Sequence, residues 1–196
     1  VNLVEFSPLS GGIAACIQAA AAAKPLGMLI AGEPSLPPEA LPAELPVVLL
    51  GSYDRLENCN ICGIHYRDAA EKMVSHLHTM GHRSIWLLQS SGESPEKAAI
   101  TAGYRQAAAA LGLTDRQCRV LEAEDSVVGG YRICREEILT EEPPQAVFAV
   151  SDELAMGVIK AAREENIPLP EGLAVAGFTG SEAAAVITPA LTTMEH

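Results

Sequence analysis

The stretch from Gln145 to Met194, QAVFAVSDELAMGVIKAAREENIPLPEGLAVAGFTGSEAAAVITPALTTM, indicates the fold class of this 196-residue chain. Its first segment, Ala146 to Val150, is apolar throughout, as is typical of a parallel strand with both faces covered. After Ser151-Asp152, apolar residues recur at helical spacing, and a second apolar segment runs from Leu173 to Phe178. A strand, a helix and a strand in this order predict a right-handed parallel unit.

The carboxyl ends of these two predicted strands are the expected location of a binding site. In open α/β sheets, ligands bind beyond the carboxyl ends of the strands. Here the residues at those ends are Ser151 and Thr179-Gly180. We expect the strands that end at Ser151 and Phe178 to lie side by side and to open onto a gap between two halves of the molecule.

The rest of the chain continues the alternation of strands and helices. The further predicted strands are Asn2–Glu5, Gly27–Ala31, Pro46–Leu50, Cys59–Ile64, Ser84–Gln89 and Arg119–Glu122. The further predicted helices are Gly12–Ala23, Arg67–Met80, Pro95–Leu111 and Val127–Thr140. Ser94-Pro95 is typical of an N-cap followed by the first helical residue, and Gly81 is typical of a helix end.

Composition limits the classes of function. A DNA-binding surface requires clustered Lys and Arg, but the net charge is −12 and the 13 Lys and Arg residues are scattered. We therefore expect that this chain does not bind DNA by itself. Five cysteines without framework spacing indicate a reducing, cytoplasmic location. No apolar run approaches the roughly 20 residues of a membrane span.

Several motifs occur in the order of a known family. The chain resembles the effector-binding core of lactose-repressor-type (LacI/GalR) transcriptional regulators. The C-terminal motifs that carry the resemblance are Ser151-Asp152, Ala155-Met156-Gly157, Pro168-Leu169-Pro170, Val175-Ala176-Gly177-Phe178 and Pro189-Ala190-Leu191-Thr192-Thr193. The upstream motifs are Gly81-His82-Arg83-Ser84-Ile85, Ala102-Gly103-Tyr104 and Gly129-Gly130-Tyr131.

The resemblance implies an α/β fold of the periplasmic-binding-protein-like type I, with two Rossmann-like lobes built on parallel sheets. Residues 1–63 would form part of the first lobe, residues 64–192 the second lobe, and residues 193–196 the start of the return crossing. The first lobe would be incomplete, so we expect the chain to be a fragment truncated at both ends or the ordered part of a longer protein.

The implied function is to sense a small-molecule effector and to dimerise, thereby controlling a helix-turn-helix head that is absent from this chain. Operator DNA would be bound only through that head. The alternative is a solute-binding protein of a transport system, which shares the two-lobe fold. A third class, an α/β enzyme, lacks a nucleophile-base constellation, and no P-loop, nucleophile elbow or dinucleotide-binding motif is present.

Four positions depart from the family's usual effector contacts. Where relatives carry Arg before the Ala-Gly-aromatic motif this chain has Ile100, and where they carry Asn before Asp it has Ser151. An Asp of the relatives is replaced by Thr179-Gly180, and a strand that often ends in Asp ends here at Gly51. Sugar hydroxyls need charged or amide partners. We therefore expect an effector other than an ordinary hexose: a smaller or less polar molecule, a protein corepressor, or none.

Other residues are candidates for the cleft or for structure. The Asp152 carboxylate is expected to cap the helix that begins there, in preference to contacting ligand. Backbone groups around Ser90 either cradle an anion or form an ordinary turn. The acidic run Glu122–Asp125 indicates solvated surface, although Asp125 follows a strand and either approaches the cleft or is solvated. The resemblance places Met156 and Ile187 in a homodimer interface or in the core.

We expect neither a metal nor a cofactor. Cys59 and Cys62 form a CxxC without a second pair, and residues three apart in a strand point to opposite faces. His78 and His82 have helical ligand spacing, but Gly81 interrupts the helix between them.

Overall fold

The computed structural model describes residues 12–31, 38–51, 59–140 and 142–194. The strand predicted at Asn2–Glu5 lies outside the described residues. The chain divides into two compact units, Val1–His65 and Tyr66–His196, which we call unit 1 and unit 2.

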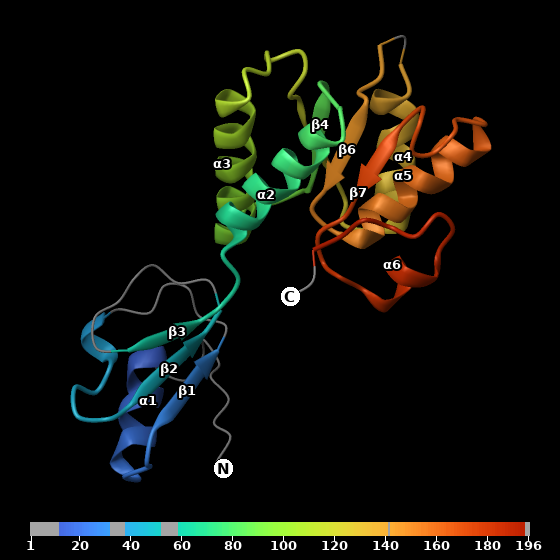
Figure 1. Cartoon of the computed structure of the whole chain (residues 1–196). Coiled ribbons are helices and arrows are strands. Elements are labelled where there is room, and N and C mark those ends of the chain that lie inside the picture. Colours follow the sequence, from blue (N-terminus) through green and yellow to red (C-terminus); the bar gives the residue numbers. More distant parts are fainter. Residues whose placement is uncertain (1–11, 32–37, 52–58, 141, 195–196) are drawn as a thin grey trace. The chain divides into compact units, whose positions relative to one another are not determined.

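Among its described residues, unit 1 contains a three-stranded parallel sheet of order β1-β2-β3, with a helix against it (Figure 1). Its elements are α1 (Ile13–Ala22), β1 (Met28–Ala31), the 3₁₀ helix η1 (Pro38–Ala40), β2 (Val47–Leu50) and β3 (Asn60–Cys62). Ile17 of α1 packs against Ile30, Val47 and Leu49 of the sheet. The alternate strand residues point away from this core, and Leu29 among them is 72% exposed.

Unit 2 contains the larger sheet, and it includes the stretch from Gln145 to Met194. Its helices and strands are α2 (Tyr66–Thr79), β4 (Ile85–Ser90), α3 (Pro95–Ala110), β5 (Val120–Ala123), α4 (Val127–Ile133), η2 (Cys134–Ile138), β6 (Ala146–Ala149), α5 (Asp152–Glu164), β7 (Ala174–Ala176) and α6 (Glu182–Val186). The strands are parallel in the order β5-β4-β6-β7. Strands β6 and β7 are neighbours, as predicted, with α5 connecting them.

Two hydrophobic clusters cover the two faces of this sheet. On one face, α2 and α3 pack against residues such as Ile85, Leu87 and Phe148. On the other face, α4 and α5 pack against Trp86, Leu88 and Val147. Figure 1 shows the sheet of unit 2 between these helix pairs. The alternation of cluster membership along β4 and β6 is that of strands buried on both sides. The predicted α/β class with parallel sheets is confirmed.

Local signals in the sequence account for several helix ends. Ser94 caps α3, since its hydroxyl accepts a hydrogen bond from the Lys97 N–H, and Pro95 is the first helical residue. At the end of α2, the N–H groups of Gly81 and His82 donate to the carbonyls of His78 and Leu77, which is the Schellman arrangement. Both predictions are confirmed.

One predicted helix differs from the structure. The segment Val127–Thr140 was expected to be a single helix, but α4 ends at Ile133 and continues as the π-helical turn η2 from Cys134 to Ile138. The Leu139 N–H donates to the carbonyl of Cys134, five residues back. Cys134 and Ile138 are both fully buried. Apolar residues four apart fit an α-helix and a π-helix alike, so the pattern does not distinguish them.

A close approach of α4 and α5 explains two glycine motifs at once. A Cβ added to Gly157 of α5 would lie 2.2 Å from the Val127 carbonyl oxygen and 2.5 Å from the Tyr131 nitrogen, both in α4. A Cβ on Gly130 of α4 would lie 2.2 Å from the Leu154 carbonyl oxygen of α5. Glycine therefore allows the two helix backbones to approach closely.

We expect the substitution Gly157→Ala to destabilise unit 2 by about 2 kcal/mol, because the new methyl group overlaps backbone atoms that have no free rotation. In an exposed helix the same change would instead stabilise the protein by roughly 1 kcal/mol. Urea unfolding, followed by the fluorescence of Trp86, the chain's one tryptophan, measures the change in unfolding free energy. The sign of this change decides between a close helix contact and an exposed helix position. A variant more stable than the wild type would contradict the close approach.

Candidate functional site

The topology of unit 2 identifies one end of its sheet as a binding edge. The first strand of the unit, β4, has β5 on one side and β6 on the other. The chain thus winds outward from β4 in one direction and then in the other. In such sheets, ligands bind beyond the carboxyl ends of the strands at this switch point. The carboxyl edge of unit 2 therefore includes Ser90, the last residue of β4, and Ser151, which follows β6.

Ser151 joins the ends of two strands on opposite sides of β4. Its hydroxyl accepts a hydrogen bond from the Leu154 N–H and so caps α5. The same hydroxyl donates to the carboxylate of Asp125, which follows β5. Ser151 is 4% exposed, whereas Asp125 is exposed. Asp125 therefore presents a solvent-accessible carboxylate whose orientation is set by a buried hydroxyl.

The carboxylate of Asp152 is the most highly connected polar group at this edge. It is fully buried. Its Oδ1 accepts hydrogen bonds from the N–H groups of Phe178 (3.1 Å) and Thr179 (3.3 Å) and from the hydroxyl of Thr193 (2.6 Å). Its Oδ2 accepts from the Ser181 N–H (2.6 Å). We call this set of bonds the Asp152 network.

This arrangement corrects the expected role of Asp152. The cap of α5 is Ser151, and the Asp152 carboxylate instead holds the loop that follows β7. In return, the Asp152 N–H donates to the hydroxyl of Thr179 at 3.1 Å. The prediction of a structural role is supported, but the partners lie 26 to 41 residues away along the chain, so a local capping rule does not find them.

Hydrogen bonding keeps Asp152 ionised despite its burial. Burial alone would raise the pKa of this carboxyl group. The bonds donated by Thr193, Ser181 and Thr179 outweigh that effect and hold the pKa below its ordinary value. A carboxylate that is more acidic in the folded chain than in the unfolded chain stabilises the fold, and this stabilisation is lost as the pH falls.

A second polar cluster lies beside the loop after β4 and was missed from the sequence. The ammonium group of Lys97, 8% exposed, donates to the Gly92 carbonyl at 2.6 Å and to Glu122 at 2.8 Å. Gln89 also donates to Glu122, and these bonds lower the pKa of Glu122. Glu122 is exposed, as expected of solvated surface, and it is in addition an ion-pair partner of Lys97. The sequence signal was a lysine within the first turn of α3, directly before the apolar run Ala98-Ala99-Ile100.

The remaining candidate residues are distributed over different environments. Thr179 and Gly180 are exposed and Ser90 is half-buried, all three at the carboxyl edge. Ile100 is 4% exposed and packs in the cluster formed by α2 and α3, which gives it a role in packing. Gly51 belongs to unit 1, where its N–H donates to the Cys62 carbonyl.

The two residues expected at a dimer interface are partly buried. Met156 lies on α5 and is half-buried. Ile187 follows α6 and packs against the cluster formed by α4 and α5. Close to Ile187, Val186 is 79% exposed.

Neither metal-like pattern acquires further ligands from the fold. Within the described residues, no group of three or more His, Cys, Asp and Glu side chains is placed to hold a metal ion. Cys62 is exposed in β3, and His82 follows the end of α2. No helix in the described part of the chain is both long and apolar enough to cross a membrane.

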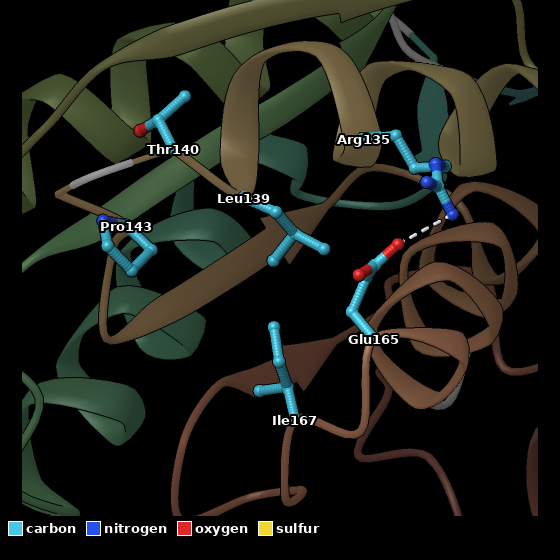
Figure 2. A pocket seen from close by; sticks show the side chains of 6 residues that line it. All are labelled: Arg135, Leu139, Thr140, Pro143, Glu165 and Ile167. Atoms are coloured by element: carbon cyan, nitrogen blue, oxygen red, sulfur yellow. Dashed lines mark ion pairs between the residues drawn. The ribbon is translucent and has the colours of Figure 1, made fainter.

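A shallow pocket of about 380 Å³ lies away from the carboxyl edge (Figure 2). It is lined by Arg135, Leu139, Thr140, Pro143, Glu165 and Ile167. Arg135 lies in η2, and the other lining residues follow η2, precede β6 or follow α5, so the pocket is at the amino end of the sheet. Figure 2 shows the Arg135–Glu165 ion pair, with a separation of 2.8 Å, on one side of it. None of the residues predicted for the site lines this pocket.

The chain is similar to known transcriptional regulators over most of its length. The periplasmic binding protein-like domain family matches residues 74–196. Catabolite control protein A of Priestia megaterium is 28% identical over 151 residues, which is 76% of this chain and 46% of that protein. The HTH-type transcriptional repressor PurR of Haemophilus influenzae is 31% identical over 142 residues, which is 71% of this chain and 41% of the repressor.

A solved structure gives the same assignment. The transcription regulator GntR of Chromobacterium violaceum has a TM-score of 0.71 and 28% identity, covering 91% of this chain and 67% of that structure. Parallel α/β units with a polar edge at a switch point are the architecture expected of a binding-protein-like domain. The chain belongs to the periplasmic binding protein-like domain family, and the relatives to which it is similar are regulators of transcription.

These similarities favour the regulator interpretation over the transport binding protein, because the relatives are regulators of transcription. None of these three relatives is named as an enzyme. The chain spans less than half the length of either relative.

We expect Asp152→Asn to destabilise unit 2 by about 3 kcal/mol at neutral pH, because an amide has one acceptor oxygen in place of two, removes the charge that strengthens the bonds, and turns an NH2 donor against the Ser181 N–H. The wild type loses the charge itself only in solution more acidic than protonates an ordinary Asp, because hydrogen bonds hold the pKa of Asp152 below its usual value. The stability difference between wild type and variant should therefore be constant above about pH 5 and shrink in more acidic solution. Urea unfolding at several pH values measures it.

The matched control is Asp125→Asn at the same edge. Asp125 is exposed, and its one hydrogen-bond partner is the hydroxyl of Ser151. The side-chain oxygen of an asparagine can accept the same hydrogen bond. We expect a change within about 0.5 kcal/mol. An Asp152→Asn variant as stable as this control would show that the Asp152 network does not stabilise the fold.

Proposed function

We propose that this chain is the effector-sensing and dimerisation core of a lactose-repressor-type transcriptional regulator. A small molecule binds between two lobes, at the carboxyl edge of unit 2, and controls DNA binding by a helix-turn-helix head elsewhere in the full-length protein. The observation that carries the proposal is that Ser90, Asp125, Ser151 and Thr179 all end or follow strands at the carboxyl edge of the sheet, where Ser151 is bonded to Asp125 across the switch point. The regulator relatives support it.

The mechanism follows from the linkage between binding and lobe closure. An effector shifts the equilibrium between two lobe arrangements only by the difference in its affinity for them. In this chain, Asp125 and Thr179 follow the outer strands β5 and β7, and Ser151 follows the inner strand β6. A molecule that contacts these oxygens would bind the arrangement in which the other lobe completes the site.

The effector is a molecule other than an ordinary hexose. Ile100 packs in the core, and Thr179 and Gly180 stand where the relatives' carboxylate is expected. The charge-assisted bonds that hold sugar hydroxyls are therefore reduced to Asp125 at this edge. A smaller or less polar molecule, or a protein corepressor, fits this edge better.

The functional assembly is a cytoplasmic homodimer. Met156 and Ile187 contribute to its interface, and the exposed Val186 beside Ile187 supports an apolar contact there. Operator DNA is bound through the head, since the net charge of −12 gives this chain no electrostatic attraction for a duplex. The proposal assigns no catalytic role to the chain.

The binding edge is tested with a panel of pentoses, hexoses, nucleobases and nucleosides, with Trp86 fluorescence as the thermal unfolding signal. We expect at least one non-hexose to raise the midpoint of thermal unfolding, and we expect Asp125→Ala to abolish the shift, because it removes the carboxylate that Ser151 orients. The matched control is Glu124→Ala, an exposed neighbour. Stabilisation by hexoses at low concentration, or binding that is unchanged in Asp125→Ala, would contradict the proposed edge.

The DNA-binding arrangement is tested by recovering the upstream coding sequence and comparing two proteins in mobility-shift assays. We expect the extended protein to select a specific duplex from a random library, and residues 1–196 to shift no duplex at physiological salt. An upstream signal peptide in place of a helix-turn-helix would support the solute-binding alternative instead.

A further inference from the structure

The loop that follows β7 is held by two side chains from distant parts of the chain. Four successive N–H groups, those of residues 178–181, all donate to side-chain oxygens. Asp152 accepts the bonds from Phe178, Thr179 and Ser181, and the hydroxyl of Thr193 accepts the bond from Gly180 at 3.1 Å. Successive N–H groups of this kind form a concavity suited to an anion. Here the anion is the protein's own carboxylate.

Whereas Asp152 begins α5, Thr193 lies in the segment that leaves the sheet after residue 192. Its hydroxyl accepts from Gly180 and donates its single hydrogen to Asp152 at 2.6 Å. The preceding residue extends the sheet, because the Gly177 N–H donates to the Thr192 carbonyl at 2.8 Å and Thr192 forms a parallel bridge with Ala176. Met194 then packs against the cluster formed by α2 and α3. Residues 192–194 are thus attached to both the sheet and the loop.

We infer that Thr193 is a positioning residue that makes the loop at residues 178–181 and the segment at residues 192–194 one cooperative unit. A contact at Thr179 or Gly180 is transmitted through the Gly180–Thr193–Asp152 bonds to the segment that leaves the sheet. The functional role of this unit rests on the proposed function, in which the segment at residues 192–194 leads into the crossing between the lobes. Through it, Thr193 couples the effector edge to that crossing.

The test is native-state hydrogen exchange of the full chain, read at the amides of Gly177, Phe178, Gly180 and Ser181. We expect Thr193→Val, which keeps the shape and removes the hydroxyl, to accelerate exchange at all four amides on the order of five- to tenfold, the effect of one lost hydrogen bond on a shared opening. Thr193→Ser should restore rates close to those of the wild type. Thr192→Val is the matched control, because Thr192 uses its backbone carbonyl in these contacts.

Acceleration confined to Gly180, or failure of the serine variant to restore protection, would overturn the inference. The wild type alone provides a second test, should the valine variant not fold. In increasing urea, the opening free energies of the four amides should converge on one value below the free energy of global unfolding. Four opening free energies that each depend differently on urea concentration would refute the cooperative unit. Since no ligand is used, these results are independent of the ligand panel, whose failure would instead refute the proposed effector site.

Discussion

The fold of unit 2 depends on the burial of one charge. A carboxylate removed from water is strongly destabilising unless hydrogen bonds compensate the lost hydration. Asp152 is fully buried and receives four such bonds, from three backbone N–H groups and one hydroxyl. The approach also requires Gly177, because a Cβ there would lie 2.1 Å from Oδ1 of Asp152. Three sequence motifs that look separate are therefore parts of one network: Ser151-Asp152, the glycine and phenylalanine that follow β7, and Thr192-Thr193.

The sequence predicts what depends on neighbours along the chain. The apolar run at Ala146–Val150 identifies a doubly covered strand, and Ser94-Pro95 identifies the start of α3, because both signals act within one element. The adjacency of β6 and β7 also follows, since a crossover helix of ordinary length leaves few alternatives. The carboxyl edge could be placed on this basis.

What the sequence does not predict is the partners of polar groups that are far apart in the chain. Asp152 beside a helix start is equally consistent with a local cap, and only the fold shows that Ser151 takes that role. Lys97 and Glu122 are 25 residues apart, so nothing local marks Glu122 as an ion-pair partner. Ile100 was considered for the cleft because of the residue type found in relatives, but its helical position directs it into the core. The π-helical turn at Cys134–Ile138 has the same apolar spacing as an α-helix.

In the described residues of unit 1, the limited burial of the sheet has a consequence for how the chain denatures. Leu29 is 72% exposed on the face opposite α1, and in the described residues that unit has a small core, centred on Ile30, Val47 and Leu49. Unit 2 buries many more side chains on both faces of its sheet. The two halves therefore differ in intrinsic resistance to heat and urea, and one midpoint will not describe the whole molecule. Trp86 lies in unit 2, so its fluorescence will report the unfolding of the more stable unit alone. Circular dichroism will also register the earlier unfolding of unit 1.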